Sequence, residues 1–173
     1  MNESFLLSIF QSELEDQCLY GRMAGDQITM GLAERRSVRV WFGVHGVLVA
    51  GGNAAKLLWG SGSPAKRDAI EAERKPFRDK VGVADDSPLR SRRMRNAFEH
   101  LDDEIIRWSK KNLNRYVGRH VDWEADESLP LESSFGRFDP KTWRLMFLEQ
   151  EPISIRALLT QFEALSSRLS PWK

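Results

Sequence analysis

The chain has 173 residues, of which 41% are hydrophobic and 29% charged, a composition that excludes an intrinsically disordered protein. The length fits a single domain over residues 1–173 built around one core. Because 26 lysines and arginines nearly balance 25 aspartates and glutamates, the net charge of +1 excludes the overall positive field of a dedicated nucleic-acid binder. Any contact with nucleic acid must come from a local patch.

The features that bear on location favour the cytoplasm. Cys18 is the lone cysteine and cannot close a disulfide within the chain, which fits a reducing compartment. The first residues, MNESFLLSIF, carry an acidic residue where a secretory signal would be basic. The most apolar stretch, from Val38 to Trp59, is interrupted by polar residues such as Arg39 and Lys56. It predicts a buried core helix, and we expect no association with a membrane.

Helical spacing dominates the first third of the chain. Apolar residues among polar neighbours predict a helix from Glu3 to Met23, with a continuation toward Glu34 left open. The stretch from Val38 to Trp59 places apolar residues three and four positions apart, although its β-branched content also suits a strand. Its length decides for a helix, since strands seldom exceed ten residues.

Turn signals divide the middle of the chain. The sequence GSGSP ends at Pro64, which is well placed to open a third helix ending near Pro76, with a loop through Val83. Ser87 then fits an N-cap with Pro88 at the first helical position. This fourth helix is predicted to run from Pro88 to about Asn112.

The last third combines loop, hairpin and helix. Residues 115–140 lack a clean period and predict a loop, with a short extended piece at 116–123 left open. Residues 142–148 and 152–155 flank a turn and predict a small hairpin. Apolar residues from 155 to 169 then follow helical spacing behind Ser154 as N-cap. The predicted fold class is mainly α, a helical bundle with a small β-hairpin near residues 142–155.

The predicted fourth helix is strongly two-sided. Rotated at about 100° per residue, its polar residues Asn96, His100 and Asp103 share one face. His100 is therefore not a core histidine. The opposite face is an apolar stripe that we expect to meet the core, formed by Met94, Ala97, Phe98, Leu101, Ile105 and Trp108.

Within that helix, residues 95–100 read Arg-Asn-Ala-Phe-Glu-His, an R-N-x-x-x-H pattern that resembles the signature of the HEPN superfamily. The resemblance covers this motif and the helical context, and hardly the rest of the chain. It implies a helical bundle that forms a homodimer and so brings two copies of the motif together. It also implies a metal-independent endoribonuclease, often a toxin or a host-defence effector.

The residue types suit that chemistry. RNA cleavage without a metal needs a proton acceptor, a proton donor and a positive group at the phosphate when the 2′-hydroxyl attacks. His100 fits the acid/base and Arg95 the phosphate clamp. Asn96 could orient the imidazole or bind the scissile phosphate, and Asp103 or Glu99 could fix the tautomer.

The helix geometry adds a constraint, because Arg95 and His100 differ by about 140° around its axis. A composite site from two copies removes this difficulty. The neighbouring Arg90, Arg92 and Arg93 either form a track for the RNA substrate or are a solvated charged face. We expect His45 to be a satisfied core histidine, and no cofactor or metal is predicted.

The sequence thus predicts a cytoplasmic, homodimeric endoribonuclease that acts on RNA, with a toxin-antitoxin or defence role and an antitoxin protein as a partner. One alternative is a catalytically silent HEPN-like module that binds a protein or a nucleotide. Another is an unrelated helical scaffold that carries the motif by chance.

Overall fold

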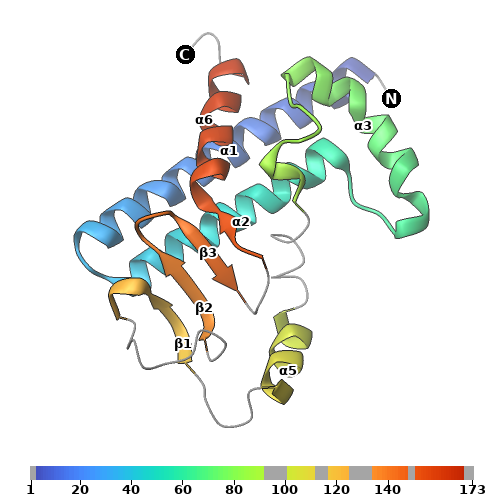
Figure 1. Cartoon of the computed structure of the whole chain (residues 1–173). Helices are drawn as coiled ribbons and strands as arrows, with labels where there is room; N and C mark the ends of the chain where they lie inside the picture. The colour runs from blue at the N-terminus through green and yellow to red at the C-terminus, as the bar shows by residue number, and fades with distance from the viewer. Residues whose placement is uncertain (1–2, 92–100, 112–116, 125–133, 148–150, 170–173) are drawn as a thin grey trace.

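The computed structural model describes residues 3–91, 101–111, 117–124, 134–147 and 151–169 (Figure 1). Over these residues the chain is mostly helical and carries a small sheet of four strands, which confirms the mainly α class. No helix among them is both long and apolar enough to cross a membrane. The helices are α1 (Glu3–Ala33), α2 (Ser37–Trp59), α3 (Arg67–Val81), α5 (Leu101–Lys111) and α6 (Ile155–Leu169).

The two longest helices, α1 and α2, form an antiparallel hairpin against which the other elements pack (Figure 1). Both predicted helices are confirmed, and α1 continues past Gly21 to Ala33. Gly21 does not interrupt the helix because α6 packs there: a Cβ atom at this position would overlap the ring of Phe162. Gly43 allows α1 and α2 to pack closely within the hairpin, since a Cβ at this position would lie 2.6 Å from the Ala24 carbonyl oxygen.

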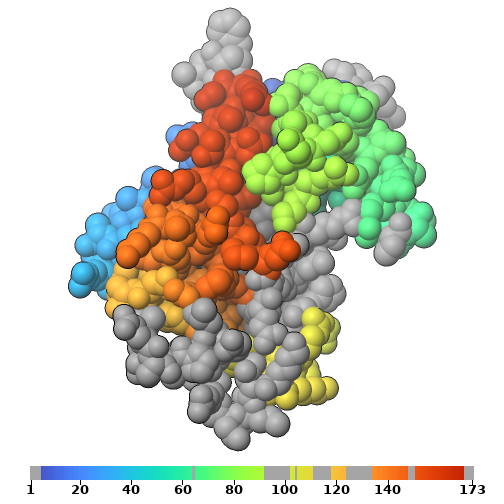
Figure 2. Space-filling model, viewed as in Figure 1, coloured from blue at the N-terminus to red at the C-terminus, as the bar shows by residue number. Residues whose placement is uncertain are grey.

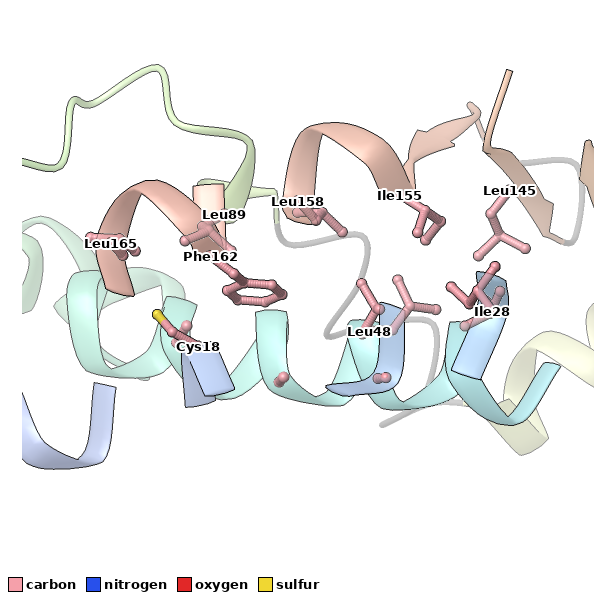
Figure 3. Packing of buried hydrophobic residues seen from close by; sticks show 14 of the residues in the cluster. Cys18, Ile28, Leu48, Leu89, Leu145, Ile155, Leu158, Phe162 and Leu165 are labelled. Carbon is pink, nitrogen blue, oxygen red and sulfur yellow. The ribbon is translucent and has the colours of Figure 1, made fainter. Parts of the chain in front are cut away.

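Helix α6 crosses the hairpin and closes the core, with Phe162 directed toward α1 and α2 (Figure 3). The predicted N-cap is confirmed, because the Ala157 N–H donates to Ser154 Oγ over 3.2 Å. The predicted apolar stripe is also confirmed, and its buried members are Ile155, Leu158, Phe162, Leu165 and Leu169.

The third helix was predicted to end near Pro76, and this is wrong. After a single 3-10 turn at Pro64–Lys66, α3 continues through Pro76 to Val81. A proline inside a helix costs about 3 kcal/mol. The following turn offsets this cost by burying Phe77 and Val81, while the buried Arg78 guanidinium donates to the Leu58 carbonyl over 2.9 Å.

The prediction of one helix from Pro88 to Asn112 is also wrong. Ser87 does accept a hydrogen bond from the Leu89 N–H, but Pro88–Arg90 form only a 3-10 turn, and Ser91 is extended. The turn is held in place because Leu89 is fully buried and the Ser87 hydroxyl donates to Gln161 of α6 over 2.9 Å. Figure 2 shows this segment lying beside α6.

Helix α5 also departs from its predicted burial. Trp108 is buried edge-on against Phe135, with ring centroids 6.0 Å apart, as the stripe predicts. Ile105, however, was expected to face the core and is 41% exposed. The buried Trp108 therefore packs this helix against the sheet.

The sheet has the strand order β1 (Val117–Val121), β2 (Ser134–Asp139), β3 (Arg144–Phe147) and β4 (Ile153–Ser154). The pairing of β3 with β4 confirms the predicted hairpin, and β1 matches the predicted extended piece. The loop predicted over 115–140 is corrected by β2, which lies parallel to β1 and antiparallel to β3. Gly136 of β2 lets the sheet approach α2, since a Cβ there would lie 3.1 Å from the Trp41 ring.

Candidate functional site

Most of the residues that the motif singles out lie outside the described part of the chain. This holds for the predicted catalytic residues, for one of the two orienting residues and for two of the basic residues, namely Arg92, Arg93, Arg95, Asn96, Glu99 and His100. The described part of α5 starts with Leu101, the residue that directly follows His100 in the sequence. Of the predicted site, Arg90 and Asp103 are described.

Asp103 is exposed on the first turns of α5, in agreement with its predicted place on a polar face. Arg107, four residues later, is exposed as well, whereas Trp108 points into the protein. The described part of this helix therefore turns a charged face to solvent directly after the motif.

Arg90 is engaged in structural contacts. Its guanidinium lies 2.9 Å from the Glu71 carboxylate of α3 and donates to the Asp85 carbonyl over 3.2 Å. These contacts hold the 3-10 turn against α3. An RNA phosphate at Arg90 would therefore compete with an existing ion pair.

A second group of residues, an arginine and a histidine beside three aromatic rings, was not foreseen from the sequence and lies where β1 meets α2. The guanidinium carbon of Arg119 lies 5.8 Å from the centroid of the Trp41 ring. It also lies 5.5 Å from the ring of Phe135 and 5.9 Å from that of Phe147. We call Arg119, these three aromatic residues and His45 the Arg119 cluster.

His45 lies one helical turn after Trp41, and it is exposed, so the prediction of a core histidine is wrong. Apolar residues occupy nearly the whole circumference of α2, and the exposed side also carries Val38 and Phe42. Spacing alone could not indicate which side is covered. Partial burial, and then the positive charge of Arg119, lower the pKa of His45 below its ordinary value of 6.5, which favours the neutral imidazole at neutral pH.

His120 and Cys18 have side chains of reactive types, and neither belongs to a candidate site. His120 faces away from the Arg119 cluster, because successive residues of a strand point to opposite faces, and its Nδ1 lies 3.2 Å from Ser134 Oγ. Burial raises the pKa of the Cys18 thiol to about 12, so its nucleophilic thiolate is not populated at neutral pH.

A cleft of about 500 Å³ lies between α1 and α6. Arg22 and Asp26 line it from α1, and Arg156 and Glu163 line it from α6. The Arg156 guanidinium lies 5.6 Å from the ring of Trp143, which also borders the cleft. Because the two signs of charge balance, this cleft does not favour an anionic substrate.

The described residues include no group of three or more histidine, cysteine, aspartate or glutamate side chains that could hold a metal ion. The signal for the Arg119 cluster in the sequence is slight: Trp41 and His45 are four residues apart, but Arg119 lies near Trp41 only because β1 packs against α2. Compared with protein-family models, with curated protein sequences and with solved structures, the chain has no match.

Proposed function

We propose that this protein is a metal-independent endoribonuclease of the HEPN type, in which Arg95 and His100 act on RNA. The observation that carries the proposal is the R-N-x-x-x-H spacing in the sequence directly before Leu101, the first described residue of α5. The exposure of Asp103 on α5 is consistent with it, because the motif was predicted to share a solvent-facing polar face with this residue. A toxin-antitoxin or defence role, with an antitoxin as partner, is part of the same proposal.

In the proposed reaction, His100 accepts the proton of the 2′-hydroxyl as this oxygen attacks the adjacent phosphorus. The bond between phosphorus and the 5′-oxygen breaks, and a second acid, His100 of the other copy, protonates the leaving oxygen. Arg95 stabilises the charge on the non-bridging oxygens. A neutral base and a protonated acid are both available near pH 7 because the ordinary pKa of histidine lies close to it.

The proposed reaction should not depend on a divalent ion. Cleavage of an end-labelled single-stranded RNA is expected to proceed at an unchanged rate in excess chelator, since two histidines and two arginines supply the acid, the base and the positive charge. The measurement is a time course by gel with and without chelator. Activity that disappears in chelator and returns with a divalent ion would contradict the proposed chemistry.

An exposed apolar surface on the hairpin supports the proposed homodimer. We call it the α1/α2 apolar face, formed by Tyr20, Met23, Met30, Val38, Phe42 and Val49. Val38 is 86% exposed and Phe42 69%. The two helices contribute neighbouring stripes, as the 3.3 Å contact between Arg39 Nη2 and Met30 Sδ indicates.

The size of this face suits a second copy of the chain. Four of its six side chains are more than half exposed, namely Tyr20, Met23, Val38 and Phe42. Monomers rarely exceed about 300–600 Å² in one apolar patch, and a stable interface covers about 800 Å² per partner. Two antiparallel hairpins packed through this face would form a four-helix arrangement around a two-fold axis. The dimer was predicted to include the polar face of residues 88–112, and of this face Asn96 and His100 lie outside the described ranges.

Disruption of the α1/α2 apolar face should therefore produce a monomer. Phe42→Asp and Met23→Asp are each expected to shift the chain from dimer to monomer in sedimentation at micromolar concentration, because each buries a charge in the interface. Ala72→Asp is the control, since Ala72 is exposed on α3 and belongs neither to this face nor to residues 88–112. A wild-type chain that sediments as a monomer would contradict the dimer.

The same face favours one other function, a catalytically silent module that uses it to bind a partner protein. This alternative and the endoribonuclease differ in their response to His100→Ala. A silent module shows no cleavage above the level of that variant, whereas the enzyme loses its activity on the substitution.

A further inference from the structure

The cleft between α1 and α6 is lined by matching faces of the two helices. Each helix contributes four residues at positions i, i+3, i+4 and i+7, namely Arg22, Gly25, Asp26 and Thr29 from α1 and Arg156, Leu159, Thr160 and Glu163 from α6. The helices are antiparallel here, because Gly21 faces Phe162 and Gly25 faces Leu159. A volume of about 500 Å³ suits a small molecule.

Four charged side chains line this cleft, and all four are exposed to solvent, namely Arg22, Asp26, Arg156 and Glu163. Within the described ranges none of them makes an ion pair, although each sign of charge is present twice. A ligand with a single charge would be attracted by two of these side chains and repelled by the other two. A ligand that carries both charges can bind all of them favourably.

The charges are ordered along the cleft. Arg156 and Glu163 lie at opposite ends of the α6 face and are about 10 Å apart along the helix axis, at a rise of about 1.5 Å per residue. Asp26 of α1 lies nearer the middle, and Arg22 lies toward the Glu163 end because the helices are antiparallel. The Arg156 end is therefore positive, and the rest of the cleft, with two carboxylates and one arginine, is negative.

Trp143 fixes the position of the positive end. Its ring borders the cleft, and the Arg156 guanidinium carbon lies 5.6 Å from the ring centroid. The backbone of Trp143 is left-handed, with a φ of 55° that a bulky residue rarely adopts. Its N–H donates to the Asp139 carbonyl over 2.8 Å, and its own carbonyl accepts from the Ile155 N–H over 3.0 Å. Arg156 is thus pre-organised to bind an anionic group at this end.

We propose that the cleft binds a short peptide of about three residues with free termini. The peptide carboxylate binds Arg156, and the terminal ammonium group binds Glu163 and Asp26. An extended chain advances roughly 3.3–3.6 Å per residue, so three residues span the roughly 10 Å between Arg156 and Glu163. The middle residue lies over the apolar floor that Gly25 and Leu159 form.

This peptide site is separate from the surfaces described above. It shares no residue with the R-N-x-x-x-H motif, so peptide binding does not depend on RNA cleavage. On α1 its lining residues lie roughly 100° around the helix axis from Met23 and Met30. A dimer formed through the α1/α2 apolar face therefore leaves the cleft open.

The test measures binding of the tripeptide Ala-Leu-Ala to the full chain by calorimetry, and follows the indole N–H signal of Trp143 by NMR. Arg156→Gln and Glu163→Gln are each expected to weaken binding roughly 10-fold, since each removes a charge-assisted hydrogen bond. The termini of the peptide are then blocked one at a time. Amidation of the carboxylate should abolish the effect of Arg156→Gln alone, and acetylation of the amine that of Glu163→Gln alone.

Matched variants provide the controls. Arg36→Gln and Glu73→Gln remove the same charges from exposed residues outside the cleft and should leave the affinity unchanged. Melting curves establish that each variant is folded. The proposal is overturned if both cleft variants bind the tripeptide like the wild type, or if the tripeptide leaves the Trp143 signal unmoved. Free leucine that binds as tightly as the tripeptide would contradict the assignment to a peptide.

Discussion

Replacement of His100 by alanine should lower the rate of RNA cleavage by roughly 10²–10⁴-fold, the contribution typical of a general acid or base. Arg95→Ala should cause a loss of similar size, because it removes the positive charge from the phosphoryl oxygens in the transition state. Neither change should shift the free energy of unfolding by more than about 0.5 kcal/mol, since both residues lie outside the apolar stripe predicted from the sequence. The experiment pairs a cleavage time course with a melting curve.

A matched variant distinguishes catalysis from a general effect of charge. Arg107→Gln removes a positive charge from an exposed position on α5 and should leave the cleavage rate within a few-fold of the wild type. If His100→Ala lowers the melting temperature strongly, the histidine is structural. If it retains full cleavage and an unchanged melt, the catalytic assignment is wrong.

Phe162→Ala should lower the free energy of unfolding by roughly 3–5 kcal/mol. The ring is fully buried at the centre of α6, and it packs over Gly21, where α1 has no side chain to fill the space left behind (Figure 3). Small domains have about 5–15 kcal/mol of stability in total, so this single change removes a large share. Urea unfolding measures it through the shift in midpoint.

The neighbouring residue provides the control for this prediction. Glu163 is exposed on the same turn of α6, and Glu163→Ala should change the free energy of unfolding by less than about 0.5 kcal/mol. A Phe162→Ala variant that unfolds within 1 kcal/mol of the wild type would mean that α6 does not close the core as described.

Local signals in the sequence were sufficient for several elements. The spacing of apolar residues located α1, α2 and α6. Ser154 marked the start of α6, because its hydroxyl accepts a hydrogen bond from the N–H of Ala157, three residues later in the chain. The hairpin of β3 and β4 was also predictable, because its two strands lie on either side of one short turn. In each case the interactions that define the element join residues close in the chain.

Elements that depend on distant partners were predicted wrongly. Strand β2 contains Gly136 and follows a segment with loop-type residues, yet it forms because β1 and β3 pair with it on either side. Helix α3 continues through Pro76 because the side chain of Phe77 is buried in the core. The helix predicted from Pro88 is interrupted after one 3-10 turn, because the side chain of Leu89 is also buried in the core. Burial of these side chains outweighs the local preference of the backbone.

The two candidate sites also differ in whether local sequence or tertiary packing brings their residues together. The R-N-x-x-x-H motif is visible in the sequence because its chemistry lies within six consecutive residues, although the composite site proposed for it needs a second copy. The Arg119 cluster joins residues from α2, β1, β2 and β3, and only the docking of the sheet on the hairpin places Arg119 against Trp41. The sequence by itself thus located α1, α2 and α6, since helical periodicity depends on neighbours three and four residues away. Tertiary structure alone decided which side of α2 is covered and left His45 exposed, because that choice depends on packing between segments far apart in the chain.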